Sequence, residues 1–177
     1  VMDTGTRREL AGTEYAKRRQ ACEVTARELG LRSLRDATHS DLNRLDLRNG
    51  SNLKRAQHVI TENIRVKKAV EAIQSQDIVE LGRLMTESHA SLKNDYEVSG
   101  PALDEIVKNA LNSQYCFGAR MTGGGFAGCA IALVKSGKVD QFCSEILENY
   151  RSPALQPAES PTKVFPVRAS AGASLLQ

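Results

Sequence analysis

Glycine residues gather in the stretch from Gly118 to Cys129, which reads GARMTGGGFAGC and runs into the apolar segment Ala130 to Val134. Inside a regular helix or strand each glycine costs about 1 kcal/mol relative to alanine, so this clustering disfavours a packed element. Glycine permits a positive φ and lets main-chain N–H groups approach a bulky or anionic group. The stretch therefore predicts a loop of bare backbone that meets a phosphate or a neighbouring phosphate-binding loop.

Two nucleotide-binding motifs have to be weighed against this loop. Gly123, Gly125 and Gly128 formally satisfy G-x-G-x-x-G, but a dinucleotide-binding fold needs a helix directly after the glycines and an acidic residue about twenty positions later. Here the glycines continue into Cys-Ala-Ile-Ala-Leu-Val, which favours a strand. A phosphate-binding Walker A loop also fails, because Lys135-Ser136 follows a valine rather than a glycine.

A hairpin whose turn happens to be rich in glycine stays open as the simplest alternative. It leaves Arg120 and Thr122 unexplained, because a guanidinium and a hydroxyl beside exposed backbone suit a phosphate or another polar loop.

Other side chains that could do chemistry are dispersed along the chain. His39, His58 and His89 share no local cluster with a cysteine or a second histidine, so we expect surface or hydrogen-bonded positions. The acidic residues near the middle of the chain suit a charged helix start better than a magnesium site: Asp95, Glu97, Asp104 and Glu105. Tyr15 is by default a half-buried aromatic whose hydroxyl reaches water or a partner. The residues alone predict no self-contained catalytic set.

Composition sets limits on class and compartment. The 177 residues carry a net charge of +3 and fit one domain of ordinary size. The four cysteines lack C-x-x-C or zinc spacing, which indicates free thiols in a reducing compartment. The basic residues are scattered at helical periods, and no apolar run reaches the length of a membrane span. We therefore expect a soluble, cytoplasmic protein that binds neither nucleic acid nor a membrane.

The elements that position the loop and Tyr15 follow from hydrophobic periodicity and capping residues. We expect helices over residues 13–29, 40–47, 53–74, 77–89, 101–111 and 139–150, with a break at 49–52 and a polar linker at 91–99. Gly30 suits the left-handed end of the first helix, and Pro101 suits the first turn of its own. Strands are expected at 1–3, 115–121, 128–134 and 162–168. The fold class is α+β, with helices packed on a small, mostly antiparallel sheet.

Three segments of the sequence resemble the galactokinases of the GHMP small-molecule kinase family. GARMTGGGFAGCAIALV, residues 118–134, resembles the third conserved motif in its galactokinase version. TESHASLKNDYEVSGPALDEIV, residues 86–107, is similar to the segment before that motif, and AGTEYAKRRQACE, residues 11–23, to the stretch that follows the amino-terminal half. With KVFPVRASAGASLL at the end, the resemblance covers nearly the whole chain. The sequence departs from the family at Ala127, which is usually glycine, and at Gly100, where cysteine is common.

The resemblance implies that this sequence is the later part of a longer protein. Residues 1–12 would end a strand of the amino-terminal half and connect it onward, and residues 13–177 would form a GHMP kinase carboxy-terminal domain. The family's sugar-recognition signature, phosphate-cradling loop, catalytic aspartate and arginine all lie upstream of these segments.

The implied activity is transfer of the γ-phosphoryl group of MgATP to the anomeric hydroxyl of galactose, in a cleft between two halves. Tyr15 would contact the sugar, and Gly123, Gly124, Gly125 and Gly128 would pack beside the phosphate-binding loop, supported by Arg120, Thr122 and Phe126. No catalytic or metal-binding residue would lie in this chain, because the amino-terminal half would hold most of the ATP and Mg²⁺. The chain alone would be inactive.

Two other functions remain open. A galactokinase-like regulatory protein would sense sugar and ATP without turnover. A basic helical interaction module would use the charged first part, where 15 lysines and arginines face nine acidic residues up to Val70.

Overall fold

The computed structural model describes residues 1–7, 12–45, 50–170 and 172. Within these residues the chain forms the helices α1 (Gly12–Glu28), α2 (Gly50–Gln74), α3 (Ile78–Asn94), α4 (Pro101–Asn112) and α5 (Val139–Asn149). Short 3₁₀-helices span Leu34–Asp36 and His39–Arg44. The strands are β1 (Met2–Asp3), β2 (Cys116–Met121), β3 (Cys129–Val134) and β4 (Lys163–Val164).

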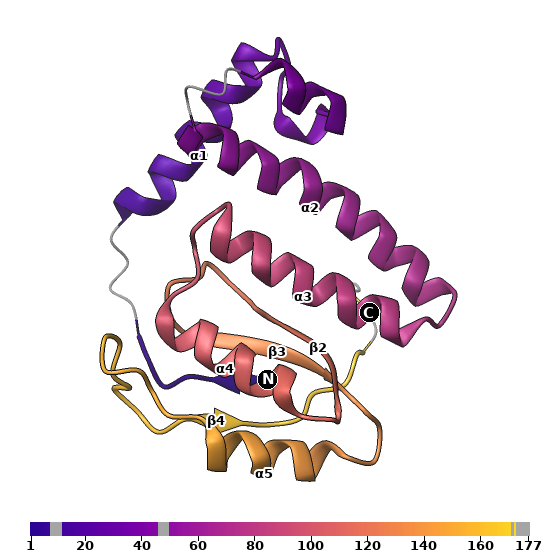
Figure 1. The fold of residues 1–177 in the computed structure, drawn as a ribbon, viewed down its shortest axis with the longest axis vertical. Coiled ribbons are helices and arrows are strands. Elements are labelled where there is room, and N and C mark those ends of the chain that lie inside the picture. The colour runs from indigo at the N-terminus through magenta and orange to yellow at the C-terminus, as the bar shows by residue number, and fades with distance from the viewer. Residues whose placement is uncertain (8–11, 46–49, 171, 173–177) are drawn as a thin grey trace, which may run out of the picture.

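The described strands form one four-stranded sheet in the order β2-β3-β1-β4, and every neighbouring pair is antiparallel. Ala130 of β3 pairs with Met121 on one side and with Met2 on the other. β1 and β4 therefore lie side by side, with β1 inside the sheet and β4 at one edge (Figure 1). The predicted α+β class with a small antiparallel sheet is confirmed.

The main hydrophobic core lies between this sheet and the helices α4 and α5. α4 begins with Pro101 in its first turn, as the sequence predicted, and buries one apolar face. The core side chains come from both layers: Met2, Leu103, Ile106, Val107, Ala110, Ala119, Met121, Ala130, Phe142 and Ile146. α4 is thereby fixed against β2 and β3, the two strands that lead into and out of the glycine loop.

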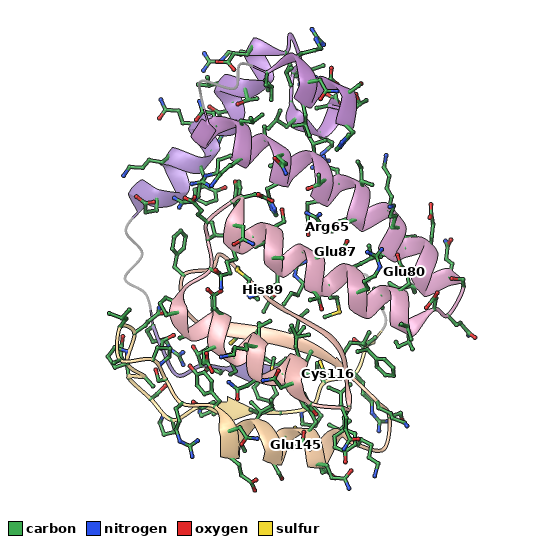
Figure 2. The ribbon with its side chains drawn as sticks, in the orientation of Figure 1. Arg65, Glu80, Glu87, His89, Cys116 and Glu145 are labelled. Atoms are coloured by element: carbon green, nitrogen blue, oxygen red, sulfur yellow. The ribbon has the colours of Figure 1, made fainter. Side chains whose placement is uncertain are left out.

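The outer edge of β2 is covered by α3 rather than left open. A Cβ on Gly82 would lie 2.2 Å from Phe117 O, and a Cβ on Gly118 would lie 1.9 Å from Gly82 O, so helix and strand meet backbone to backbone. The Met121 N–H donates to His89 Nδ1 at 3.3 Å, and Figure 2 shows His89 below α3. Covering an edge strand satisfies its unpaired main-chain groups and blocks pairing with another chain.

The remaining helices extend the molecule away from the sheet. α2 packs on α3, and α1 packs on the first part of α2 (Figure 1). A second, smaller core joins them and contains Ala26, Leu29, Leu34, Leu45 and Ala56. α1 ends as predicted at Gly30, which has φ +71°, and the Leu31 N–H donates to Ala26 O at 2.8 Å.

Four local expectations were wrong in their bounds. α3 continues to Asn94 instead of ending near His89, because polar residues of the expected linker form hydrogen bonds with one another. The Ser91 hydroxyl, for example, donates to Asp95 Oδ2 at 2.7 Å. α2 starts at Gly50, inside the expected break, of which residue 49 lies outside the described residues. The helix expected at 40–47 is a 3₁₀-helix over His39–Arg44, and residues 46–47 lie outside the description. The last strand shrinks to Lys163–Val164, between prolines that cannot donate to the ladder.

The apolar side chains spaced along α2 differ in burial between its two halves. Ala56 and Ile60 are buried, whereas Val66, Val70 and Ile73 are 56%, 48% and 60% exposed. In the described part of the chain no helix combines the length and the apolar character that crossing a membrane would require.

Candidate functional site

The glycines form a loop that joins β2 to β3 at one end of the sheet. The antiparallel ladder continues one step past β2, where the Thr122 N–H donates to Cys129 O at 3.0 Å. Beyond this pair the backbone turns through residues with φ of +79° at Gly123, +84° at Gly125, +69° at Phe126 and +92° at Gly128. A strand, not a helix, follows the glycines, so the loop has hairpin geometry and not the geometry of a dinucleotide-binding fold.

Gly125 holds the tip of the loop against the segment before α4. A Cβ at this position would lie 2.0 Å from Val98 O, which also accepts the Phe126 N–H at 2.6 Å. No larger residue fits there without displacing backbone, and the positive φ adds strain for any other residue type.

Gly123, Gly124 and Gly128 show the opposite environment. A Cβ built on any of them meets no heavy atom within 4 Å. Gly123 and Gly128 have a positive φ that explains the choice of glycine, whereas Gly124 has neither a positive φ nor a close neighbour. This side of the loop therefore presents bare backbone to open space.

The base of the loop is tied to the start of the chain. Gly128 O accepts both the Thr4 N–H at 3.0 Å and the Thr4 hydroxyl at 2.7 Å. The Thr6 hydroxyl lies 2.7 Å from Thr4 Oγ1, and both threonines are buried. Because Thr4 Oγ–H is used by Gly128, Thr6 is the donor in that second bond.

Gln156 is a residue of the site that the sequence did not reveal. Its Nε2 donates to Phe126 O at 2.5 Å, while its Oε1 accepts the Ala102 N–H at 3.0 Å. One side-chain amide thus joins the loop to the first turn of α4. The residue lies between Pro153 and Pro157, and nothing in the sequence there distinguishes this glutamine from others.

Tyr15 is exposed, which corrects the expectation of a half-buried aromatic. It lies in the first half of α1, and 70% of its surface is accessible. By contrast, Ala26 and Leu29, farther along the chain, are buried in the second core. The phenol is therefore available to a partner.

The supporting residues expected near the loop separate into two groups. Phe126 lies within the loop, and the Arg18 guanidinium carbon lies 5.1 Å from the centroid of its ring. Thr122 forms the base of the loop through its N–H. Arg120 instead turns toward α2, where its Nη1 lies 3.4 Å from Glu62 Oε1, so it serves packing between α2 and β2.

The two inner histidines are hydrogen-bonded groups of the interior, in agreement with the expectation. His58 Nδ1 lies 3.0 Å from Ser91 Oγ, and burial lowers the pKa of His58 to about 4. Since the Ser91 hydroxyl donates to Asp95, His58 is the donor to Ser91 Oγ. His89 joins the edge of β2 to α4, where its Nε2 lies 3.5 Å from Asp104 Oδ1.

A second polar cluster lies between α2 and α3 and contains Glu62. The Ser88 hydroxyl donates to Glu62 Oε1 at 2.5 Å, and Arg65 Nε donates to Oε2 at 2.8 Å. Burial raises the pKa of Glu62, but the hydrogen bonds and nearby guanidinium groups outweigh it and hold that pKa below its usual range. Figure 2 shows Arg65 of this cluster facing the gap between the two helices.

The described residues contain no group of three His, Cys, Asp or Glu side chains that could hold a metal ion. All four cysteines are free, and burial raises the pKa of each thiol. The candidate site predicted from the sequence thus consists of an exposed phenol, Tyr15, and a backbone loop, Gly123 to Gly128.

Comparison with known proteins identifies relatives of this arrangement. Residues 69–152 match the family model described as GHMP kinases C terminal. The galactokinase of Limosilactobacillus reuteri (strain DSM 20016) is 40% identical over 157 residues, which cover 85% of this chain and 40% of that protein. The galactokinase of Thermotoga petrophila is 43% identical over 151 residues, which cover 85% of this chain and 42% of that protein.

A solved structure shares the fold. The crystal structure of Lactococcus lactis galactokinase complexed with galactose matches with a TM-score of 0.77 and 34% sequence identity, over 83% of this chain and 39% of that one. The chain thus spans about two fifths of the length of the relatives that it matches. The domain match shows that residues 69–152 form a GHMP kinase carboxy-terminal region, and the sequence identity and the shared fold show that the chain is a homologue of the carboxy-terminal part of galactokinases.

Proposed function

We propose that this chain is the carboxy-terminal part of a galactokinase that transfers the γ-phosphoryl group of ATP to the anomeric hydroxyl of galactose. The observation that carries the proposal is the loop Gly123 to Gly128. It turns bare backbone toward open space at three glycines, and it lies in a chain about 40% identical to galactokinases. The product would be galactose 1-phosphate.

In this proposal the chain contributes positioning rather than bond chemistry. Phosphoryl transfer depends on alignment of the two substrates and on neutralisation of charge. The exposed phenol of Tyr15 would contact the sugar, and the glycine loop would support a phosphate-binding loop from the amino-terminal half of the same protein. The groups that act on the sugar hydroxyl would belong to that half.

The residues present fit a role beside ATP without binding it alone. Open space over Gly123, Gly124 and Gly128 leaves room for a phosphate-binding loop to approach the backbone. MgATP supplies the phosphoryl group when it is bound, and the amino-terminal half would provide most of its contacts, including those to Mg²⁺. The whole protein would act in the cytoplasm, where free thiols persist, with galactose as substrate and with neither nucleic acid nor a membrane as a partner.

The test is a galactose phosphorylation assay on the 177-residue polypeptide and on the complete gene product, with ATP and Mg²⁺. We expect galactose 1-phosphate from the complete protein and none from the polypeptide. Turnover by the polypeptide alone would show that this chain contains the catalytic groups. If the complete protein binds both galactose and ATP but forms no product, the regulatory function replaces the catalytic one.

A further inference from the structure

Arg18 is a buried arginine of α1 that contacts three separate segments through one guanidinium group. Only 9% of its surface is exposed. Its Nε donates to Tyr96 O at 3.0 Å and its Nη2 donates to Glu97 O at 2.7 Å. Its Nη1 donates to Glu14 O at 3.1 Å and to Glu14 Oε2 at 2.5 Å.

The same guanidinium reaches the glycine loop. Its central carbon lies 5.1 Å from the ring centroid of Phe126, a distance typical of a cation–π contact. Phe126 follows Gly125 directly, and its N–H donates to Val98 O. Arg18 therefore links α1, the segment before α4 and the tip of the loop.

The position of Arg18 on α1 places this link close to Tyr15. The apolar core contacts of α1 lie in its second half, at Cys22, Ala26 and Leu29. Tyr15 lies in the first half, only three residues before Arg18. The Arg18 guanidinium therefore holds the first half of α1, which carries Tyr15, against the segment before α4. Its planar fork can donate to several carbonyl groups at once.

We propose that Arg18 is a positioning residue for phosphoryl transfer, which holds Tyr15 at a fixed separation from the glycine loop. This inference rests on the proposed galactokinase function. Tyr15 would face the sugar and the loop would face the phosphate, so Arg18 sets the relative placement of the two substrates from this half of the protein. Displacement of a substrate-positioning group by about 1 Å can cost a hundredfold in rate.

Arg55 provides a matched control. It is also buried, with 7% of its surface exposed, and it binds the same segment through Asp95 O and through Glu97 Oε2, the latter at 2.5 Å. It comes from α2, and both of these bonds go to the segment before α4 rather than to α1 or the glycine loop. A loss specific to the link between Tyr15 and the loop should therefore appear at Arg18 and not at Arg55.

The experiment compares Arg18→Gln, Arg18→Lys and Arg55→Gln in the complete protein that carries this chain. Arg18→Gln should raise KM for galactose about tenfold and lower kcat about tenfold, with KM for ATP changed by no more than about twofold. Arg18→Lys should recover part of the loss, because lysine keeps the charge but not the fork. Arg55→Gln should lower thermal stability and leave both kinetic constants of the folded enzyme within about twofold.

A second measurement does not depend on turnover. Amide hydrogen exchange in peptides covering α1 and residues 121–129 should accelerate together in Arg18→Gln, and Arg55→Gln should not reproduce this paired effect. If Arg18→Gln folds poorly, Phe126→Leu removes the ring beneath the guanidinium, keeps an apolar side chain toward the core, and should change the same observables in the same direction.

Wild-type KM for galactose and wild-type kcat in folded Arg18→Gln would overturn the positioning role, as would unchanged exchange in the loop. Absence of product from the wild-type protein would instead overturn the galactokinase function. Amide hydrogen exchange would still test whether Arg18 couples α1 to the glycine loop.

Discussion

Neither the contacts nor the backbone conformation of the described residues requires glycine at position 124. Within the described residues no atom lies close to a Cβ at this position, and its φ lies outside the positive range. Alanine would therefore fit sterically, and it would lower the entropy of the unfolded chain. The reason for glycine is expected to come from outside this chain, from the phosphate-binding loop that the proposal places against it.

Gly124→Ala should lower activity with little effect on stability, whereas Gly125→Ala should lower stability. Gly124→Ala should change the free energy of unfolding by no more than about 1 kcal/mol, yet lower the kcat of the complete protein about tenfold because the methyl group separates the two loops. Gly125→Ala should lose about 1–3 kcal/mol of stability, because its Cβ would lie 2.0 Å from Val98 O. Chemical denaturation and steady-state kinetics measure both. Full activity of folded Gly124→Ala would argue against the supporting role of the loop.

Tyr15→Phe isolates the hydroxyl of the exposed phenol. Because the side chain is 70% exposed, we expect stability to change by no more than about 0.5 kcal/mol. Loss of one hydrogen bond to a neutral sugar should raise KM for galactose about three- to tenfold, with KM for ATP unchanged. Kinetics of the complete protein at varied galactose and varied ATP separate the two constants. Equal effects on both substrates would contradict a sugar contact.

At the scale of elements, the contact between α3 and β2 depends on two glycines. Gly82→Ala places a methyl group 2.2 Å from Phe117 O, so helix and strand must separate. We expect a loss of about 1–3 kcal/mol in the free energy of unfolding. Gly50→Ala is the control, because Gly50 is also helical but has no atom within 4 Å of a built Cβ. It should be neutral or stabilise by up to about 1 kcal/mol. Equal effects of the two changes would contradict the close packing of α3.

The elements themselves were largely predictable from periodicity and capping residues. Pro101 and Gly30 marked helix ends correctly, because their backbone preferences act locally. The sequence did not predict that Gly82 would meet Gly118, because that contact depends on tertiary packing. It also predicted a half-buried Tyr15, whereas the residues of α1 that contact the second core, Cys22 and Ala26, lie in the second half of the helix.

The site was predictable where it depends on backbone and not where it depends on distant side chains. The glycine loop was expected at its observed place, because clustered glycine has few uses besides an unusual backbone. Gln156 and Arg18 could not be identified, since the contacts of Gln156 with Phe126 and of Arg18 with Tyr96 join residues at least thirty positions apart in the sequence. Resemblance to a family supplied the proposed roles of Tyr15 and the loop, which remain predictions.

At the scale of the whole molecule, stability should depend on pH through His58. Burial lowers its pKa from 6.5 to about 4 in the folded chain, so between these values the unfolded chain binds more protons. The stabilising contribution of neutral His58 is complete above pH 6.5 and is lost as the pH falls toward 4, by about 3 kcal/mol. His58→Asn, which keeps a donor for Ser91, should flatten this dependence. Denaturation at several pH values measures it, and identical slopes for both proteins would exclude His58 as the cause.

The place of β1 in the sheet governs the order in which the chain can fold. Met2 pairs with Ala130 and with Val164, so β1 must wait for partners synthesised more than a hundred residues later. Such distant pairings slow folding, since a long loop must close before its contacts stabilise it. During synthesis one edge of β1 stays unpaired until β3 emerges and the other until β4 emerges, and the helices α1 and α2 can form first. Pairing of β4 with β1 is thus the last step that completes the sheet carrying the glycine loop.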